Sequence, residues 1–176
     1  MSSGPIPTSD PRTVLRFATA SDAPTILALI RGLAEYEKLL HECIADETAL
    51  ARTLFGDRRY AEVVIAEHEG RAAGFALFFH NYSTFLARPG IYLEDLFVRP
   101  ELRGRGIGET LLAFLAKLAV ERDCGRVEWS VLDWNEPAIG FYRKLGAVPM
   151  DEWTVFRVTG PALVELAGRF DAPASP

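Results

Sequence analysis

Two adjacent carboxylates, Glu94 and Asp95, interrupt an otherwise apolar run from Ile91 to Val98. The run is rich in β-branched, aromatic and aliphatic residues, which predicts a β-strand. Because side chains alternate between the two faces of a strand, we expect the two carboxylates to point in opposite directions. A carboxylate in such a strand is costly unless it is paired or faces a wet groove. We therefore expect one acid to have a structural partner and the other to be available for chemistry.

A glycine-rich segment, Arg103 to Gly108, follows Pro100, which cannot donate a backbone hydrogen bond to a sheet. Apolar residues at helical spacing come next, so the segment leads from a strand to a helix N-terminus. Free N–H groups and the helix dipole favour an anion there, and the alternating glycines let a phosphate approach the backbone. The spacing differs from a dinucleotide loop, whose third glycine would replace Glu109, and from a P-loop. A tight turn that exposes surface arginines is the structural alternative.

A second motif begins at Asn135-Glu136-Pro137 and continues as a short predicted helix. Asn135 can cap the helix or bind a ligand amide, and Pro137 is tolerated in a first helical turn. Tyr142 lies about two helical turns after Asn135. We interpret the neighbouring Phe141 as a core residue. The phenol of Tyr142 needs a partner if it is buried, so this residue either packs in the core or contacts a ligand.

The composition is that of a globular protein, since 49% of the 176 residues are hydrophobic and 24% are charged. One domain is expected over residues 13–170, with loose tails at 1–12 and 171–176. The apolar runs are too short to span a membrane. The net charge of −5 argues against nucleic acid as a partner and suits a cationic substrate. The cysteines and histidines show no metal-ligand spacing, and reduced cysteines are consistent with a cytoplasmic location.

The expected elements are a strand, two helices, three strands, a helix, a strand, a helix, a strand and a closing helix. This order predicts an α/β (α+β) fold around a mixed sheet. Ser21 and Asp46 are expected to cap the first two helices. The expected strands are 14–18, 60–67, 72–80, 91–98, 126–132 and 153–158, with a loop at 81–90 and a closing helix at 161–170.

Four motifs, LEDLFV, RGRGIG, WNEP and FYRKLGA, together resemble the GNAT superfamily of N-acetyltransferases. Within it they are most similar to the spermidine/spermine (diamine) and thialysine N-acetyltransferase branch. The sequence LAEYE in the first helix is also similar to that branch, and the likeness covers about residues 14–170. The resemblance implies the GNAT fold, with helices on both faces of a mixed sheet, and acetyl-CoA as co-substrate without a metal.

The resemblance also implies roles for single residues. Tyr142 would protonate the departing CoA thiolate, and Glu94 would bind and deprotonate the amine. The strand backbone would hold the pantetheine arm, the glycine loop the pyrophosphate, and the second motif the far side of the cofactor. These cofactor residues are Leu96, Phe97, Val98, Arg103, Gly104, Arg105, Gly106, Ile107, Gly108, Glu109, Asn135, Glu136, Pro137, Ala138 and Tyr142. The candidate amine-binding residues are Tyr36, Glu37, Glu94, Asp95, Glu128, Trp129, Ser130 and Glu152.

The implied activity is direct transfer of an acetyl group to a small primary amine, such as a polyamine or thialysine. An alkyl ammonium with a pKa of about 10.4 cannot attack until it loses a proton, and a carboxylate can accept that proton directly or through one water. A protein or peptide acetyltransferase and a catalytically silent acyl-CoA-binding domain are the alternatives. The residues do not choose between polyamine and thialysine. By analogy with the family we also expect a homodimer.

Overall fold

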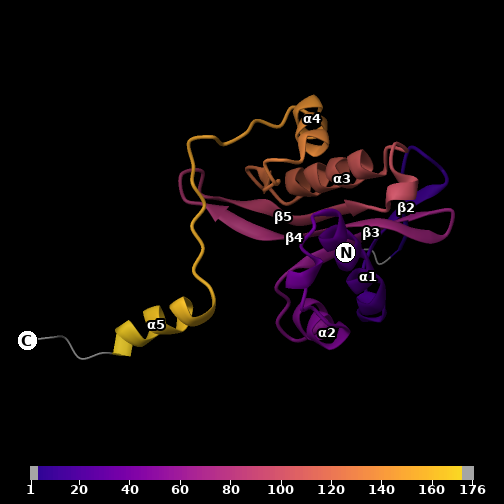
Figure 1. Cartoon of the computed structure of the whole chain (residues 1–176). Coiled ribbons are helices and arrows are strands. Elements are labelled where there is room, and N and C mark those ends of the chain that lie inside the picture. The colour runs from indigo at the N-terminus through magenta and orange to yellow at the C-terminus, as the bar shows by residue number, and fades with distance from the viewer. Residues whose placement is uncertain (1–3, 172–176) are drawn as a thin grey trace, which may run out of the picture. The chain divides into compact units, whose positions relative to one another are not determined.

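A mixed sheet of six strands, in the order β1-β2-β3-β4-β5-β6, organises the first 130 residues (Figure 1). The structure is a computed structural model, and it describes residues 4–171. Neighbouring strands are antiparallel from β1 to β5, and β5 and β6 are parallel. The strands are β1 (Ile6–Pro7), β2 (Thr13–Phe17), β3 (Glu62–His68), β4 (Arg71–Ser83), β5 (Arg88–Val98) and β6 (Val127–Trp129).

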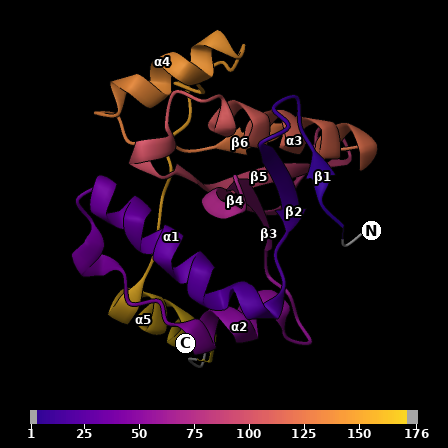
Figure 2. The same cartoon turned by 90° about the vertical axis from the view of Figure 1, so that its right-hand side faces the viewer.

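Helices cover both faces of this sheet. The helices α1 (Ala23–Tyr36) and α2 (Glu47–Phe55) lie on one face, and α3 (Ile107–Glu121) lies on the other (Figures 1 and 2). Three short 3-10 helices, Ala20–Asp22, Leu40–Glu42 and Pro100–Leu102, lie in the connections. None of the helices within residues 4–171 is both long enough and apolar enough to cross a membrane.

An apolar core joins α1 and α2 to the sheet. Its residues come from both helices and from three strands, and every one of them is almost completely removed from water, which is the main source of folding free energy. The cluster consists of Ile26, Leu27, Leu29, Leu50, Leu54, Val63, Ile65, Phe75 and Phe97. Because Phe97 of β5 belongs to this cluster, the end of β5 is fixed against α1.

A second compact unit comprises residues 131–176. Its described part contains α4 (Glu136–Lys144) and α5 (Gly160–Asp171). Asn135 caps α4 as predicted, because its Oδ1 accepts a hydrogen bond from the N–H of Ala138 at 3.4 Å. The strand predicted at 153–158 is wrong, since these residues are exposed and pair with no strand in the described chain. A β-prone sequence becomes a strand only when a neighbouring strand accepts its hydrogen bonds.

Two other predictions in the first unit, a loop and a helix cap, are wrong. The loop predicted at 81–90 is mostly a continuation of β4 and β5, which pair as far as Ser83 and Arg88. Proline and glycine at its end suggested a turn, but both lie within β5. Ser21 does not cap α1, which begins after Asp22. The predicted cap at Asp46 is confirmed by a 2.7 Å hydrogen bond from the N–H of Ala49.

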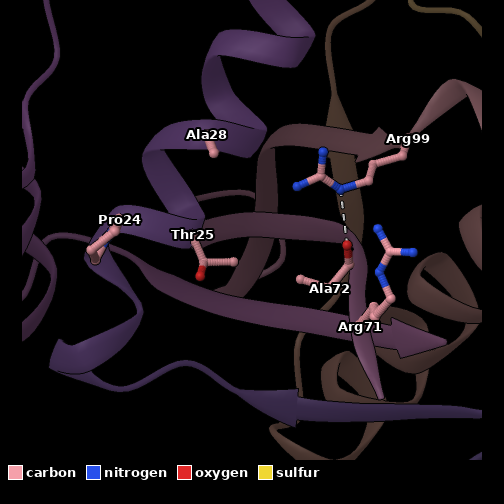
Figure 3. A pocket seen from close by; sticks show the side chains of 6 residues that line it. All are labelled: Pro24, Thr25, Ala28, Arg71, Ala72 and Arg99. Carbon is pink, nitrogen blue, oxygen red and sulfur yellow. Dashed lines mark hydrogen bonds between the residues drawn. The ribbon is translucent and has the colours of Figure 1, made fainter. Parts of the chain in front are cut away.

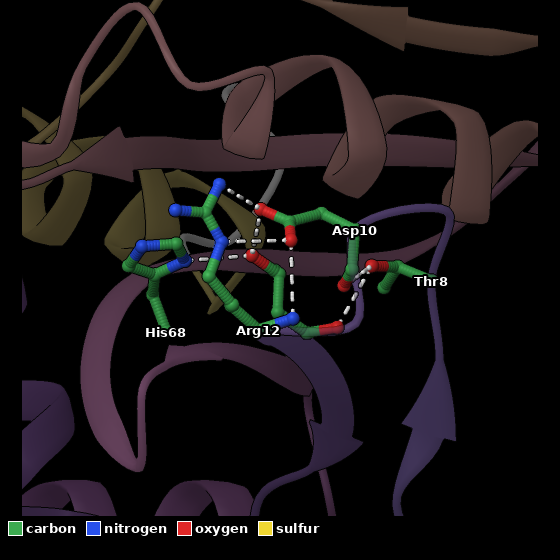
Figure 4. Close-up of polar contacts among 5 residues, drawn as sticks. Thr8, Asp10, Arg12 and His68 are labelled. Atoms are coloured by element: carbon green, nitrogen blue, oxygen red, sulfur yellow. Dashed lines mark hydrogen bonds and ion pairs between the residues drawn. The ribbon is translucent and has the colours of Figure 1, made fainter.

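The segment before β2 is more ordered than the expected loose tail. β1 pairs with β2, and Thr8 Oγ1 donates a hydrogen bond to the carbonyl of Thr13 at 2.7 Å. Arg12 pairs with Asp10 through both its backbone N–H and its guanidinium (Figure 4). These contacts join the segment to the sheet. Residues 1–3 and 172–176 of the two predicted tails lie outside the described residues.

Candidate active site

One edge of β5 is open over half of its length. β6 pairs with β5 only from Ile91 to Leu93, whereas β4 pairs with β5 as far as Val98. Within the sheet, the backbone from Glu94 to Val98 therefore has a strand partner on one side only. Unpaired N–H and C=O groups at such an edge can bind an extended ligand like an added strand. This open edge contains Leu96, Phe97 and Val98, the residues predicted to hold pantetheine.

A β-bulge lies where the open edge begins. Leu93 pairs with Phe78 and Asp95 pairs with Leu77, so Glu94 is an extra residue with no opposite residue on β4. A bulge bends its strand and redirects the side chains around it. The expectation that Glu94 and Asp95 point to opposite faces assumed unbroken alternation, and the bulge removes that assumption.

Three carboxylates come close together at this bulge. Glu94 is exposed, Asp95 is half-buried, and Glu37 is half-buried at the C-terminus of α1. Burial, reinforced by the charges of Glu94 and then Glu37, raises the pKa of Asp95 to about 6. Burial also raises the pKa of Glu37. Within residues 4–171, neither Glu94 nor Asp95 has a hydrogen-bond or salt-bridge partner, so the structural partner expected for one of them is absent.

Arg103 joins the glycine loop to both α1 and β5. Its guanidinium lies over the ring of Tyr36, 4.4 Å from the ring centroid, and 5.7 Å from the centroid of Phe97. Its Nε donates a 3.1 Å hydrogen bond to the carbonyl of Val98. The contact between Arg103 and Tyr36 was not predicted, because the two residues lie far apart in the sequence. This contact brings Tyr36, a predicted amine-binding residue, to the beginning of the glycine loop.

The glycine loop has the backbone expected of an anion site. Gly104 and Gly106 have φ angles of +74° and +77°, a left-handed conformation that residues with a Cβ avoid. α3 starts at Ile107 without a side-chain cap, so its first N–H groups depend on a ligand or water for acceptors. Ile107 is buried and anchors the helix, whereas Arg105 and Glu109 are exposed. The predicted residues thus form a loop that can present N–H groups to a phosphate.

The predicted acceptor residues on and after β6 already have partners. Glu128 accepts a 2.7 Å hydrogen bond from Asn81 Nδ2 and pairs with Arg126 Nε at 2.7 Å. Ser130 Oγ shares a 2.9 Å hydrogen bond with the hydroxyl of Tyr92, and Trp129 is half-buried. The charge of Glu128 is therefore balanced by Arg126. The sequence did not suggest Asn81, because its partner lies two strands away.

The remaining predicted residues belong to the second unit. Glu136 and Pro137 form the first turn of α4, and Ala138 donates its N–H to the cap residue. Tyr142 is half-buried in the same helix, with its ring centroid 5.4 Å from that of Phe141. Glu152 is exposed in a turn. Within this unit, one short helix therefore carries both the predicted cofactor residues and the predicted proton donor.

A model of the acetyltransferase (GNAT) family matches residues 29–147. The chain belongs to this family. GNAT enzymes use acetyl-CoA as co-substrate. The family prediction is thus confirmed, and the mixed sheet with helices on both faces is the GNAT fold.

Similar proteins place the chain more closely within the family. Thialysine N-epsilon-acetyltransferase of Mus musculus is 39% identical over 89% of this chain and 98% of its own length. L-ornithine N5-acetyltransferase of Arabidopsis thaliana is 36% identical, with 85% of each chain covered. A solved integron cassette protein from V. cholerae superposes with a TM-score of 0.76 at 26% identity, covering 89% of this chain and 98% of the other. The predicted likeness to the thialysine branch is confirmed.

Acetyl-CoA fits the residues of this GNAT chain on two structural grounds. The open edge of β5 offers unpaired backbone groups next to the bulge, and the uncapped N-terminus of α3 offers N–H groups behind two left-handed glycines. The first feature suits the amides of pantetheine, and the second suits a pyrophosphate. Both features involve the backbone, so side-chain type matters chiefly at the glycines.

Proposed function

We propose that this protein acetylates a small primary amine that carries a second positive charge. The observation that carries the proposal is the group of three carboxylates, Glu37, Glu94 and Asp95, at the point where β5 loses its partner strand. Carboxylates hold an ammonium by charge-assisted hydrogen bonds. The two relatives support an amine acceptor, because thialysine and ornithine both carry a terminal primary amine.

Glu94 is assigned to bind the acceptor ammonium and to remove its proton, directly or through one water. It is exposed at the bulge and has no described partner, so its oxygens are available to a ligand. Asp95 is a second candidate for the same proton, because a base with a pKa of about 6 is closer to neutral pH than an ordinary carboxylate. Glu37 and Tyr36 would hold the other charged end of the substrate, and this fixes the reacting nitrogen.

Acetyl-CoA would supply the acetyl group as a thioester. The backbone of Leu96 to Val98 is assigned to pantetheine, and the segment Arg103 to Glu109 to the pyrophosphate. Asn135 to Ala138 are assigned to the far side of the cofactor. These assignments are supported by the open edge, by the uncapped helix and by the family motif.

Tyr142 is assigned to donate its phenolic proton to the CoA sulfur as the thiolate leaves. A phenol with a pKa of about 10 holds its proton at neutral pH and can transfer it to a thiolate that is formed beside it. The support for this role is the family motif around Tyr142, since the packing against Phe141 fits a structural residue equally well. No covalent bond to the enzyme is needed.

We also propose that the protein is a homodimer. The segment from 148 to 170 exposes several large apolar side chains, among them Trp153, Phe156 and Phe170. Exposed apolar surface of this kind is typical of a subunit interface. Light scattering of the purified protein at micromolar concentration should give about twice the 19.5 kDa chain mass. A mass equal to one chain would contradict the proposal.

One comparison of acceptors tests the proposed function. The kcat/KM for acetyl transfer, followed by CoA thiol release, is measured for spermidine, thialysine, ornithine, a neutral monoamine and a lysine-containing peptide. We expect the three charged small amines to exceed the monoamine and the peptide by about tenfold or more, which corresponds to about 1.4 kcal/mol of transition-state stabilisation. Preference for the peptide would favour a protein acetyltransferase, and preference for the monoamine would contradict a role for the three carboxylates. Absence of transfer to every amine, with acetyl-CoA still bound, would favour a silent binding domain.

A further inference from the structure

A pocket with two arginines shares no lining residue with the three carboxylates or with the glycine loop. It has a volume of about 410 Å³ and is lined by the N-terminal half of α1, by the start of β4 and by the residue after β5. The lining residues are Pro24, Thr25, Ala28, Arg71, Ala72 and Arg99 (Figure 3). One wall of the pocket is α1, which covers one face of the sheet, whereas the glycine loop leads into α3 on the other face (Figures 1 and 2).

The two guanidinium groups in this pocket lack carboxylate partners among the residues that the structure describes. Within residues 4–171 no Asp or Glu forms a salt bridge with Arg71 or Arg99. Most other arginines of the sheet region are paired: Arg12 with Asp10, Arg16 with Asp22 and Glu67, and Arg122 with Glu62. Two like charges that line one pocket repel each other unless an anion lies between them. The pocket is therefore a place of uncompensated positive charge in a protein whose net charge is −5.

The backbone holds one of these arginines in place. Arg99 Nε donates a 2.9 Å hydrogen bond to the carbonyl of Ala72, and its own N–H donates to the carbonyl of Ala73 at 2.9 Å. The two terminal nitrogens of Arg99 have no acceptor among the described residues. A guanidinium whose Nε is fixed presents its other N–H groups in one direction, which reduces the entropy lost when an anion binds.

The remaining wall adds two further features that suit an anion. Pro24 and Thr25 belong to the first turn of α1, which is the positive end of the dipole of a 14-residue helix. Thr25 carries a hydroxyl that can donate to an oxygen atom. The pocket, at about 410 Å³, is larger than a phosphate group, so there is room for the group attached to it.

From these contacts we infer that the pocket binds the phosphate group of a small molecule, with Arg71 and Arg99 as its two charged ligands. Guanidinium groups bind tetrahedral dianions through several parallel hydrogen bonds, and two of them neutralise a dianion. The phosphate could belong to a free metabolite or to the 3′-phosphate of CoA, which shares the same chemistry. This inference does not depend on acetyl transfer, because it concerns phosphate binding alone.

The first measurement is calorimetric titration of the full-length protein with inorganic phosphate at constant ionic strength. We expect saturable binding whose Kd rises about tenfold in Arg71→Gln and in Arg99→Gln, the loss typical of one charge-assisted hydrogen bond. Arg31→Gln is the matched control, because Arg31 is an exposed arginine of α1 that does not line the pocket. Within residues 4–171 the side chain of Arg71 forms no hydrogen bond or salt bridge, so its substitution should leave the thermal unfolding temperature nearly unchanged. Absence of saturable binding, or equal weakening in Arg31→Gln, would overturn the inference.

A competition measurement identifies the source of the phosphate. Displacement of bound phosphate by CoA but not by dephospho-CoA would assign the pocket to the 3′-phosphate of the cofactor. A lack of displacement by either would assign it to a separate phosphorylated molecule. Equal displacement by both, with full phosphate binding retained in the two arginine variants, would mean that phosphate had bound the glycine loop, and the inference would fail.

Discussion

The raised pKa of Asp95 predicts an unusual dependence of stability on pH. Its carboxyl has a pKa of about 6 in the folded protein and the ordinary value of 3.8 when exposed. Between these two values the folded state binds more protons than the unfolded state, so the free energy of unfolding falls as pH rises. The contribution of Asp95 is complete below pH 3.8 and is lost by the time pH passes 6.

The shift sets the size of the effect. Each unit of pKa difference corresponds to 1.36 kcal/mol, so Asp95 removes at most about 3 kcal/mol of stability across this window. Burial is the largest cause, followed by the charges of Glu94 and Glu37. Substitution of Glu37 by Gln should therefore reduce the effect only in part, whereas Asp95→Asn should abolish it.

The assay is urea unfolding of the wild type and Asp95→Asn, followed by tryptophan fluorescence from about pH 4.5 to pH 8. We expect the variant to gain roughly 2 kcal/mol relative to the wild type as pH rises through this range. An amide without a hydrogen-bond partner at this position changes the free energy of unfolding by an amount that does not vary with pH. The prediction therefore concerns how the difference in unfolding free energy between the variant and the wild type changes with pH. Asp57→Asn, at an exposed loop position, is the control and should follow the wild type. If the wild-type and Asp95→Asn curves remain parallel, Asp95 is not a buried acid in solution and its role as a candidate base is lost.

Three further predictions concern the cofactor site and the sheet. Gly106→Ala places a Cβ on a residue in the left-handed conformation and should raise the Kd for acetyl-CoA about fivefold to tenfold. Calorimetry measures this Kd, with Gly168→Ala as the control, and an unchanged Kd would mean that the loop is not part of the cofactor site. Tyr142→Phe should retain acetyl-CoA binding but lower kcat by about 10²-fold, as measured by thiol release; a kcat close to that of the wild type would make Tyr142 a packing residue. Gly90→Ala places a Cβ against Asn81 Oδ1 and should destabilise the fold by about 1–3 kcal/mol in urea unfolding. Wild-type stability would mean that the side chain of Asn81 can move to avoid this Cβ.

Features that depend on a few neighbouring residues could be predicted from the sequence. The caps at Asp46 and Asn135 follow from a polar residue before an apolar helical pattern, and both are confirmed. The left-handed loop before α3 follows from alternating glycines between a strand and a helix. For the same reason the position of the glycine loop at the end of β5 could be predicted.

Features that depend on the register between paired strands could not be predicted. The bulge exists because Glu94 of β5 lies between two paired residues whose partners on β4 are adjacent in the chain. This extra residue can be recognised only once the register of the two strands is known. The same limit explains the missed continuation of both strands around residues 81–90. It also explains Asn81, which reaches Glu128 across β5 at a position where Gly90 has no side chain.

The bulge also decides which layer of the protein each later residue of β5 joins. Leu77 packs against the core under α1, and Phe78, the next residue of β4, points to the other face. Their partners on β5, Asp95 and Leu93, take the same faces and so lie on opposite sides, although they are two positions apart. If Glu94 paired within the ladder in place of bulging out, plain alternation would send Asp95 and every residue after it to the wrong face, whereas deleting Glu94 would leave Leu93 and Asp95 on their present faces. The bulge therefore keeps the contents of the two layers apart in a strand that has one residue more than its partner.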